Sequence, residues 1–201
     1  MEFKIVFIDD NMREGTSDAF VRAIGRKQPL ADISVFTNPT DGLKYVMENL
    51  NSQIIAFIDC KMDGYSMQGI DVLRKIREKT SLLCVVMMSA NSLKQMDFDL
   101  APLINEDYIW FYDRNNGSVE DACGMIEHIR KYWTSRFDCV LERWLCRHPE
   151  DMSKIALRRA DKTYTWKQIL SELRLQTEVG RLFEQMVNEY YIYQLNGREN
   201  E

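Results

Sequence analysis

The sequence predicts an α/β fold built on a five-stranded parallel doubly wound sheet, followed by an α-helical extension. Five short apolar runs alternate with helical patterns over about the first 132 residues, which is typical of parallel sheets covered on both faces. The first and third runs end in carboxylates and the fourth ends beside a serine hydroxyl, at the edge where such sheets carry their ligand sites. The remaining residues are mainly helical in periodicity. We therefore expect two regions, 1–132 and 133–201.

Each strand is predicted from an apolar run bounded by polar or turn-forming residues. The runs are KIVFIDD (4–10), ISVFT (33–37), IIAFID (54–59), LLCVVMMSA (82–90) and YIWFYD (108–113).

The helices are predicted from apolar positions that recur at helical spacing. The Asn38-Pro39 pair favours the start of the second helix, because proline is tolerated at a first helical position. The predicted helices cover 16–27, 38–50, 67–79, a short segment within 91–104 interrupted by Pro102, and a last helix from about residue 118.

The C-terminal region is expected to be a helical hairpin. One apolar stripe runs unbroken from Ser118 to Cys146, which predicts a long helix that continues out of the first region. A polar loop is expected from there to Tyr164, and Thr165 with Gln168 forms a capping-box pattern. The amphipathic stretch that follows predicts one helix, or two that are separated near residues 176–177.

Composition excludes several classes of protein. The net charge of −5 argues against non-specific binding to nucleic acid. Residues 1–133 carry 15 Lys and Arg against 20 Asp and Glu, whereas residues 134–201 carry 11 of each, so the C-terminal region is neutral. No signal peptide and no membrane span is expected, and the five cysteines show no metal-binding spacing. We therefore expect a cytoplasmic protein with reduced thiols.

Four polar residues are expected to meet at one edge of the sheet. Asp9 and Asp10 follow the first strand, Asp59 ends the third and Ser89 ends the fourth. Clustered carboxylates raise one another's pKa or require a cation. A site made only of oxygen ligands on an α/β scaffold suits Mg²⁺, which favours phosphate chemistry. The pattern predicts a Mg²⁺ site at which Asp59 attacks a phosphoryl group.

These motifs resemble a known family. KIVFIDDN, FIDCKMDG and VVMMSAN, in this order, are similar to the receiver domain of two-component response regulators over about residues 3–132. The resemblance implies a flavodoxin-like receiver fold and a signalling domain in a phosphorelay rather than an enzyme. It also implies that a histidine kinase or another phosphodonor supplies the phosphoryl group. Gly69 corresponds to a glycine of the family pattern, displaced by a two-residue insertion.

The resemblance assigns a role to each site residue. Asp9, Asp10, Asp59 and the main-chain carbonyl of Lys61 are implied as Mg²⁺ ligands. Asp59 is the implied phosphoacceptor, Ser89 the phosphoryl ligand and Tyr108 the switch aromatic residue.

One departure from the family pattern matters for the chemistry of the pocket. Phe111 stands where the family has a lysine at the end of the fifth strand. A charge about 4 Å away contributes roughly 4 kcal/mol at an effective dielectric constant near 20, before desolvation, so the loss of this ammonium group impairs the pocket. Arg114 and Lys61 are the nearby cations that can replace it.

Three alternatives remain open at this stage. A degenerate receiver can act as an adaptor independently of phosphorylation. A transcriptional regulator can bind DNA through the C-terminal helices, although the neutral charge of residues 134–201 disfavours this. A phosphohydrolase of the haloacid dehalogenase type needs Asp-x-Asp after the first strand, which this sequence lacks. We expect output through protein contacts or self-association of residues 133–201, with Tyr190–Tyr193 as the main contact.

Overall fold

The computed structural model describes residues 2–13, 17–90 and 108–197. The chain divides into two compact units, Met1–Lys131 and Tyr132–Glu201. The helix expected within residues 91–104 lies outside the described residues.

The first unit contains a five-stranded parallel sheet, as predicted from the sequence. The strand order is β2-β1-β3-β4-β5, with every neighbouring pair parallel. The first strand therefore lies in the interior of the sheet, and the chain reverses its direction of winding there. The strands are β1 (Phe3–Ile8), β2 (Ala31–Phe36), β3 (Ile54–Asp59), β4 (Cys84–Ser89) and β5 (Ile109–Asp113).

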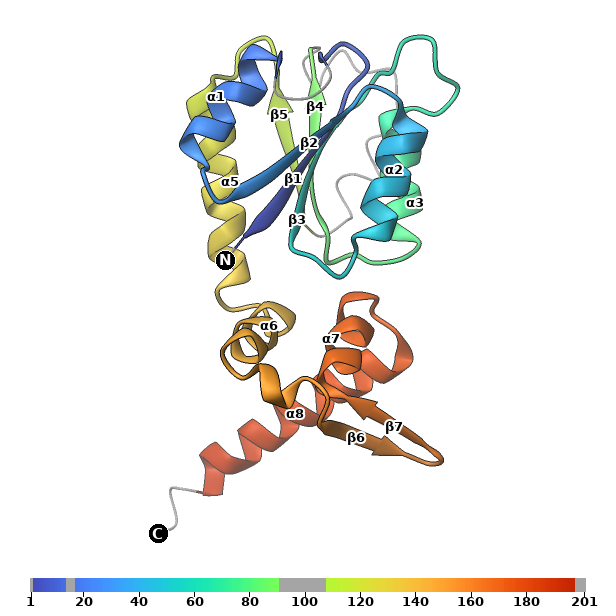
Figure 1. Ribbon diagram of the computed structural model, residues 1–201, viewed down its shortest axis with the longest axis vertical. Coiled ribbons are helices and arrows are strands. Elements are labelled where there is room, and N and C mark those ends of the chain that lie inside the picture. The colour runs from blue at the N-terminus through green and yellow to red at the C-terminus, as the bar shows by residue number, and fades with distance from the viewer. Residues whose placement is uncertain (1, 14–16, 91–107, 198–201) are drawn as a thin grey trace. The chain divides into compact units, whose positions relative to one another are not determined.

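Helices cover both faces of this sheet, which explains why its central strands are apolar throughout. In Figure 1, α1 and α5 lie on one face and α2 and α3 on the other. Every residue of β3 and β4 is buried. The helices are α1 (Ala19–Lys27), α2 (Pro39–Glu48), α3 (Gly69–Arg77) and α5 (Val119–Trp133).

Local sequence sets where the helices begin. The Asp18 carboxylate accepts hydrogen bonds from the backbone N–H groups of Phe20 and Val21 at the start of α1. Asn38 caps α2 in the same way, and Pro39 occupies its first turn.

The second unit combines helices with a small antiparallel hairpin. Its core contains Leu141, Leu145, Ile169, Leu173 and Phe183, all buried. The elements are α6 (Phe137–Arg147), the 3₁₀ helix η3 (Pro149–Asp151), β6 (Ile155–Arg159), β7 (Lys162–Thr165), α7 (Trp166–Arg174) and α8 (Glu178–Gly197).

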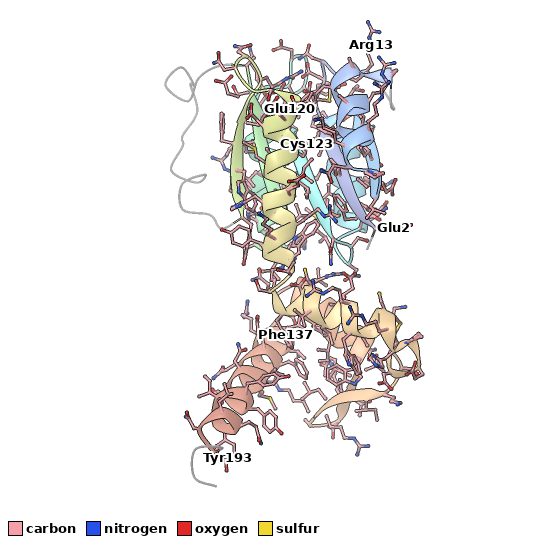
Figure 2. The ribbon with its side chains drawn as sticks, turned by 90° about the vertical axis from the view of Figure 1, so that its left-hand side faces the viewer. Glu2, Arg13, Glu120, Cys123, Phe137 and Tyr193 are labelled. Carbon is pink, nitrogen blue, oxygen red and sulfur yellow. The ribbon has the colours of Figure 1, made fainter. Side chains whose placement is uncertain are left out.

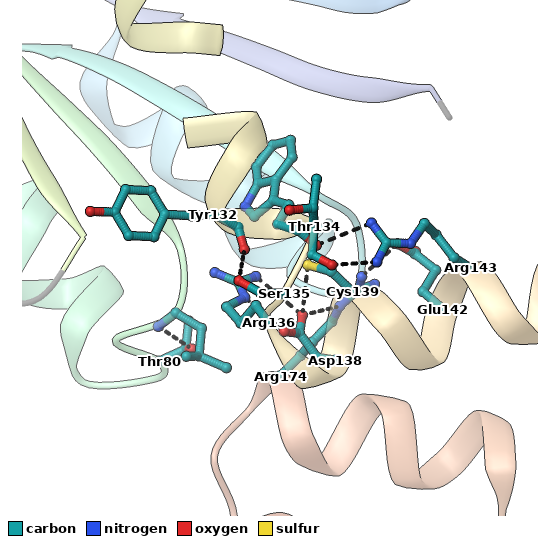
Figure 3. Close-up of polar contacts among 12 residues, drawn as sticks. Thr80, Tyr132, Thr134, Ser135, Arg136, Asp138, Cys139, Glu142, Arg143 and Arg174 are labelled. Carbon is teal, nitrogen blue, oxygen red and sulfur yellow. Dashed lines mark hydrogen bonds and ion pairs between the residues drawn. The ribbon is translucent and has the colours of Figure 1, made fainter. Parts of the chain in front are cut away.

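The predicted unbroken helix from Ser118 to Cys146 is wrong. The backbone leaves the helical conformation at Arg136, whose φ is −66° and ψ is 130°. The N–H groups of Ser135 and Arg136 both donate to the carbonyl of Tyr132 and close the end of α5. The Arg143 guanidinium donates to the carbonyls of Trp133 and Thr134, at 3.3 and 2.6 Å (Figure 3). These groups satisfy the carbonyls that a helix end leaves without partners.

The prediction of a polar loop up to Tyr164 is also incomplete, because this segment contains the hairpin of β6 and β7. The turn between the strands places Ala160 in the left-handed region, with φ of 48°. The capping box at the start of α7 is confirmed, since Thr165 and Gln168 exchange hydrogen bonds. The later amphipathic stretch forms two helices, and Gln176 between them also has a positive φ of 48°.

We found no helix among the described residues with the length and apolar character that crossing a membrane requires.

Candidate functional site

The acidic residues expected to converge do so at the carboxyl edge of the sheet. Asp9 follows β1, Asp59 ends the neighbouring strand β3, and Asp10 lies beside them. One carboxylate oxygen from each of the three residues lies within 4.8 Å of the others. Asp9 is fully buried, Asp59 is buried and Asp10 is half-buried. The three side chains thus form a compact acidic cluster that is open to solvent at Asp10.

Hydrogen bonds from the surrounding backbone fix the orientation of this acidic cluster. The Asn11 N–H donates to Asp9 Oδ1 at 2.9 Å, and the Asp63 N–H donates to Asp10 Oδ2 at 3.0 Å. The Lys61 N–H approaches Asp59 Oδ1 at 3.4 Å. Each donor leaves further lone pairs on the oxygen that it contacts, so the acidic cluster keeps free capacity for a cation.

The loop after β3 is held against the sheet by two neighbouring residues. The Gln68 side chain accepts from the Met62 N–H at 2.9 Å and donates to the Met62 and Tyr65 carbonyls. Gly69 follows, and a Cβ atom there would lie 2.0 Å from the carbonyl oxygen of Asp59. Only glycine permits this approach, which sets the position of Asp59 relative to α3.

Arg114 supplies a cation to the acidic cluster. Its Nη1 atom lies 2.5 Å from Asp9 Oδ2 and 3.3 Å from Asp59 Oδ2. The residue directly follows β5, at the same edge of the sheet. Its side chain is 30% exposed and is therefore partly open to solvent. Sequence reasoning named Arg114 only as one of two possible replacements, because nothing in the sequence shows where its side chain points.

The other sequence candidate for the missing charge lies elsewhere. The Lys61 ammonium pairs with Asp63 at 3.4 Å and is 78% exposed. Among the described cations, Arg114 is the one that contacts both buried acids.

Burial is the main cause of the raised pKa values of the two buried acids, Asp9 and Asp59. It raises the pKa of Asp9 above its usual value, with the Arg114 charge acting in the opposite direction. Burial and the neighbouring Asp9 charge raise the pKa of Asp59 to about 6, although Arg114 lowers it in part. The acidic cluster therefore disfavours its own full ionisation and favours any added positive charge.

Three further residues from the sequence analysis lie at different places along the sheet. Ser89 ends β4 beside Asp59 and is buried. Tyr108 precedes β5 and lies at the opposite end of that strand from Arg114. Phe111 is a mid-strand residue that packs against the core between the sheet, α2 and α3. The strand continues past Phe111 to Asp113, so its carboxyl end carries Arg114.

Comparison with known proteins gives matches of structure only. The sequence matches no protein-family model and no curated protein. The signal receiver domain of a protein assigned as a Luxo repressor from Vibrio parahaemolyticus matches 72% of this chain and 98% of its own, with 16% identity and a TM-score of 0.52. The apo receiver domain of nitrogen regulatory protein C matches 66% of this chain and 98% of its own, with 17% identity and a TM-score of 0.50.

A response regulator receiver domain protein from Clostridium thermocellum has higher identity, 24%, over 65% of this chain and 97% of its own, with a TM-score of 0.46. The strand order of the first unit, β2-β1-β3-β4-β5, is that of the predicted receiver fold. The N-terminal part of this chain has the fold of response regulator receiver domains.

Proposed function

We propose that residues 1–131 act as a receiver module in two-component signalling, with Asp59 as the phosphoacceptor. The observation that carries this proposal is the acidic cluster of Asp9, Asp10 and Asp59 at the carboxyl edge of a sheet with the receiver fold. The phosphodonor is a histidine kinase or another phosphorylated molecule.

The chemistry of the acidic cluster fits Mg²⁺. Its ligand groups are all oxygen atoms, and the half-buried Asp10 leaves a side open for the water molecules that Mg²⁺ retains. Asp9, Asp10, Asp59 and the Lys61 carbonyl would hold the ion. When bound, it supplies positive charge that offsets the charge on the transferring phosphoryl group.

The bonds that change in the proposed transfer lie between Asp59 and the donor. A carboxylate oxygen of Asp59 forms a bond to phosphorus, and the bond from phosphorus to the leaving group of the donor breaks, with its electron pair going to the leaving group. The product is an acyl phosphate on Asp59. Ser89, which ends the adjacent strand β4, is proposed to contact a phosphoryl oxygen.

We propose a changed assignment for the cation of the pocket. In the family pattern an aromatic residue precedes the lysine by three positions. Phe111 precedes Arg114 by three positions, and Arg114 follows the end of β5. If the family pattern is aligned three residues later in this sequence, Phe111 takes the role given above to Tyr108. Arg114 then takes the position of the lysine. The contact of Arg114 with Asp59 supports this assignment.

Output is proposed to pass through the C-terminal unit by protein contact. The last part of α8 presents large apolar side chains to solvent, with Tyr190, Tyr191, Ile192, Tyr193 and Leu195 each between 60% and 73% exposed. Figure 2 shows Tyr193 pointing outward near the end of this helix. Exposed aromatic residues in such density are typical of interaction sites.

A second function is favoured by one observation. Arg114 already provides a positive charge to Asp9 and Asp59. A cation that belongs to the chain is compatible with a site that no longer accepts a phosphoryl group. In that case the protein is an adaptor that acts independently of phosphorylation.

One experiment separates the two functions. The protein is incubated with Mg²⁺ and acetyl phosphate, and the intact mass is measured with the Asp59→Asn variant as the control. A receiver gains one phosphoryl group that the variant does not gain. An unmodified protein under conditions where Mg²⁺ binds would favour the adaptor.

A further inference from the structure

Arg114 contacts the two buried members of the acidic cluster and not the half-buried Asp10. Asp9 and Asp59 are the two buried members, and Nη1 of Arg114 lies between their Oδ2 atoms. The Oδ1 atoms of the same residues accept backbone N–H groups instead. The guanidinium therefore occupies the side of the acidic cluster that backbone donors leave open.

The backbone of Arg114 is fixed while its side chain is not enclosed. Its N–H donates to the Ser89 carbonyl at 2.8 Å. The Asp113 carboxylate accepts the N–H groups of Asn115 and Asn116 and holds the turn that follows. Because the side chain is 30% exposed, we expect rotation about its side-chain bonds to move the guanidinium into solvent without a change in the fold.

We infer that Arg114 competes with a divalent cation for Asp9 and Asp59 and thereby sets the metal affinity of the site. This inference rests on the proposed function and goes beyond it, because it assigns a regulatory role to a residue of this chain. Without metal, Arg114 neutralises one of three negative charges. With metal, Arg114 and the ion repel each other, and the guanidinium moves away from the carboxylates.

The direction of the effect follows from charge. Removing Arg114 leaves the three carboxylates with no cationic side chain in contact among the described residues, which strengthens the attraction for a divalent ion. It also ends the competition for the two Oδ2 atoms. We expect the Arg114→Gln variant to bind Mg²⁺ with a dissociation constant at least about tenfold lower than that of the native protein.

The test measures Mg²⁺ binding to the full chain by calorimetric titration. Arg26 provides the matched control, because it is an exposed arginine in the last turn of α1, and Arg26→Gln removes the same charge. We expect Arg114→Gln to bind more tightly and Arg26→Gln to bind like the native protein. Equal or weaker binding by Arg114→Gln overturns the inference, as does equal tightening by both variants.

A second measurement uses the native protein and so does not depend on a variant that folds. The side-chain N–H signals of Arg114 are followed by nuclear magnetic resonance during addition of MgCl₂. Slowed exchange with water in metal-free protein and faster exchange at saturation support release of the guanidinium. Unchanged signals at saturation contradict it.

The result is distinguishable from failure of the proposed function. If Arg114→Gln gains metal affinity but neither protein forms an Asp59 adduct with acetyl phosphate, the inference holds and the phosphoacceptor role fails. If an adduct forms and Arg114→Gln does not gain affinity, the receiver role holds and the inference fails. Absence of Mg²⁺ binding by both proteins contradicts the inference whatever the adduct result.

Discussion

Asp59 is an acid in an environment that opposes its charge, and this gives the protein a measurable pH dependence. Its pKa is about 6 in the folded chain, against a usual value of 3.8. Between these pH values the folded chain binds more protons than the unfolded chain, so the free energy of unfolding falls as pH rises. The penalty is absent below about pH 4 and complete above about pH 6. A difference of about two pKa units corresponds to roughly 3 kcal/mol.

We therefore expect the Asp59→Asn variant to lose most of this decline. Denaturant unfolding of metal-free protein at a series of pH values measures it. Glu48→Gln, at an exposed acid in the last turn of α2, is the control and should retain the native profile. A variant curve that falls as steeply as that of the native protein would show that Asp59 does not carry the effect.

Asp138 is a buried acid of the C-terminal unit, and two arginine side chains pair with its carboxylate. Its carboxylate binds Arg136 Nε at 2.7 Å and Arg174 Nε at 3.2 Å, and Arg174 also pairs with Glu142 at 2.8 Å (Figure 3). Burial alone would raise the pKa of Asp138, but the hydrogen bond and charge of Arg136, with those of Arg174, outweigh it and lower the pKa. This ion network fixes the start of α6 against α7.

Asp138→Asn should destabilise the C-terminal unit by about 3 kcal/mol, because it removes a buried charge and leaves the Arg174 guanidinium undercompensated. Chemical denaturation measures the change. The control is Asp161→Asn, at an exposed position of the hairpin turn, and it should stay within about 0.5 kcal/mol of the native protein. A similarly small effect of Asp138→Asn would mean that the network contributes little.

Sequence reasoning found the acids of the candidate site, but it named Arg114 only as one of two possible cationic partners. Asp9, Asp10 and Asp59 were predictable because strand ends of a parallel sheet meet at one edge. The contacts of Arg114 depend on where β5 ends, and an apolar run does not specify its last paired residue. Asp138 gave no signal, since an acid near a helix start is ordinarily an exposed residue that favours the helix dipole.

At the scale of elements, the chain breaks between α5 and α6 at a place that the spacing of apolar residues does not predict. The apolar stripe from α5 into α6 keeps its spacing across the break, so the pattern alone predicts one helix. The break is held by polar contacts, of Arg136 with Asp138 and of Arg143 with the Trp133 carbonyl, which the spacing of apolar residues does not reveal. The hairpin was not predicted, because β6 and β7 are short and half polar. Their sequences therefore resemble the sequence of a polar loop.

The end of α8 exposes large apolar side chains that a partner protein would cover. Consecutive residues from Tyr190 to Tyr193 point in different directions around a helix, so apolar groups surround it on all sides. Contact with another chain would bury this surface and stabilise the helix.

We expect the native protein to associate in solution and the double variant Tyr190→Ser, Tyr193→Ser to have the molar mass of one chain. Light scattering over a range of protein concentrations measures this. Replacing Glu189 and Gln194 by serine changes exposed polar positions on the same helix and should preserve the association. If the native chain is monomeric, self-association is contradicted and the surface remains available for a different protein.

At the scale of the whole molecule, the two units should respond differently to Mg²⁺. The acidic cluster lies wholly within residues 1–131, and binding to a folded unit stabilises that unit. We expect calorimetry of the full chain to show one unfolding transition that rises in temperature with Mg²⁺ and one that does not. The Asp9→Ala, Asp10→Ala variant should abolish the rise, and a rise that survives in this variant would exclude the proposed site.

The overall fold was the most predictable feature of this protein. Alternating apolar runs and helical patterns fix the order of elements, and right-handed connections leave few ways to assemble a parallel sheet. The C-terminal unit was predictable only in part, because its core draws on helices and strands whose contacts are not periodic in sequence.

The ion pairs of Arg114 have a consequence for how the protein behaves when metal ions are scarce. A positive charge that belongs to the chain cannot diffuse away or be removed by a chelator, and its local concentration does not depend on the surrounding solution. The carboxyl edge of the sheet therefore retains one countercharge in the presence of EDTA. The two buried acids thus keep a positive partner when free ions are removed, because the charge of Arg114 is covalently part of the chain.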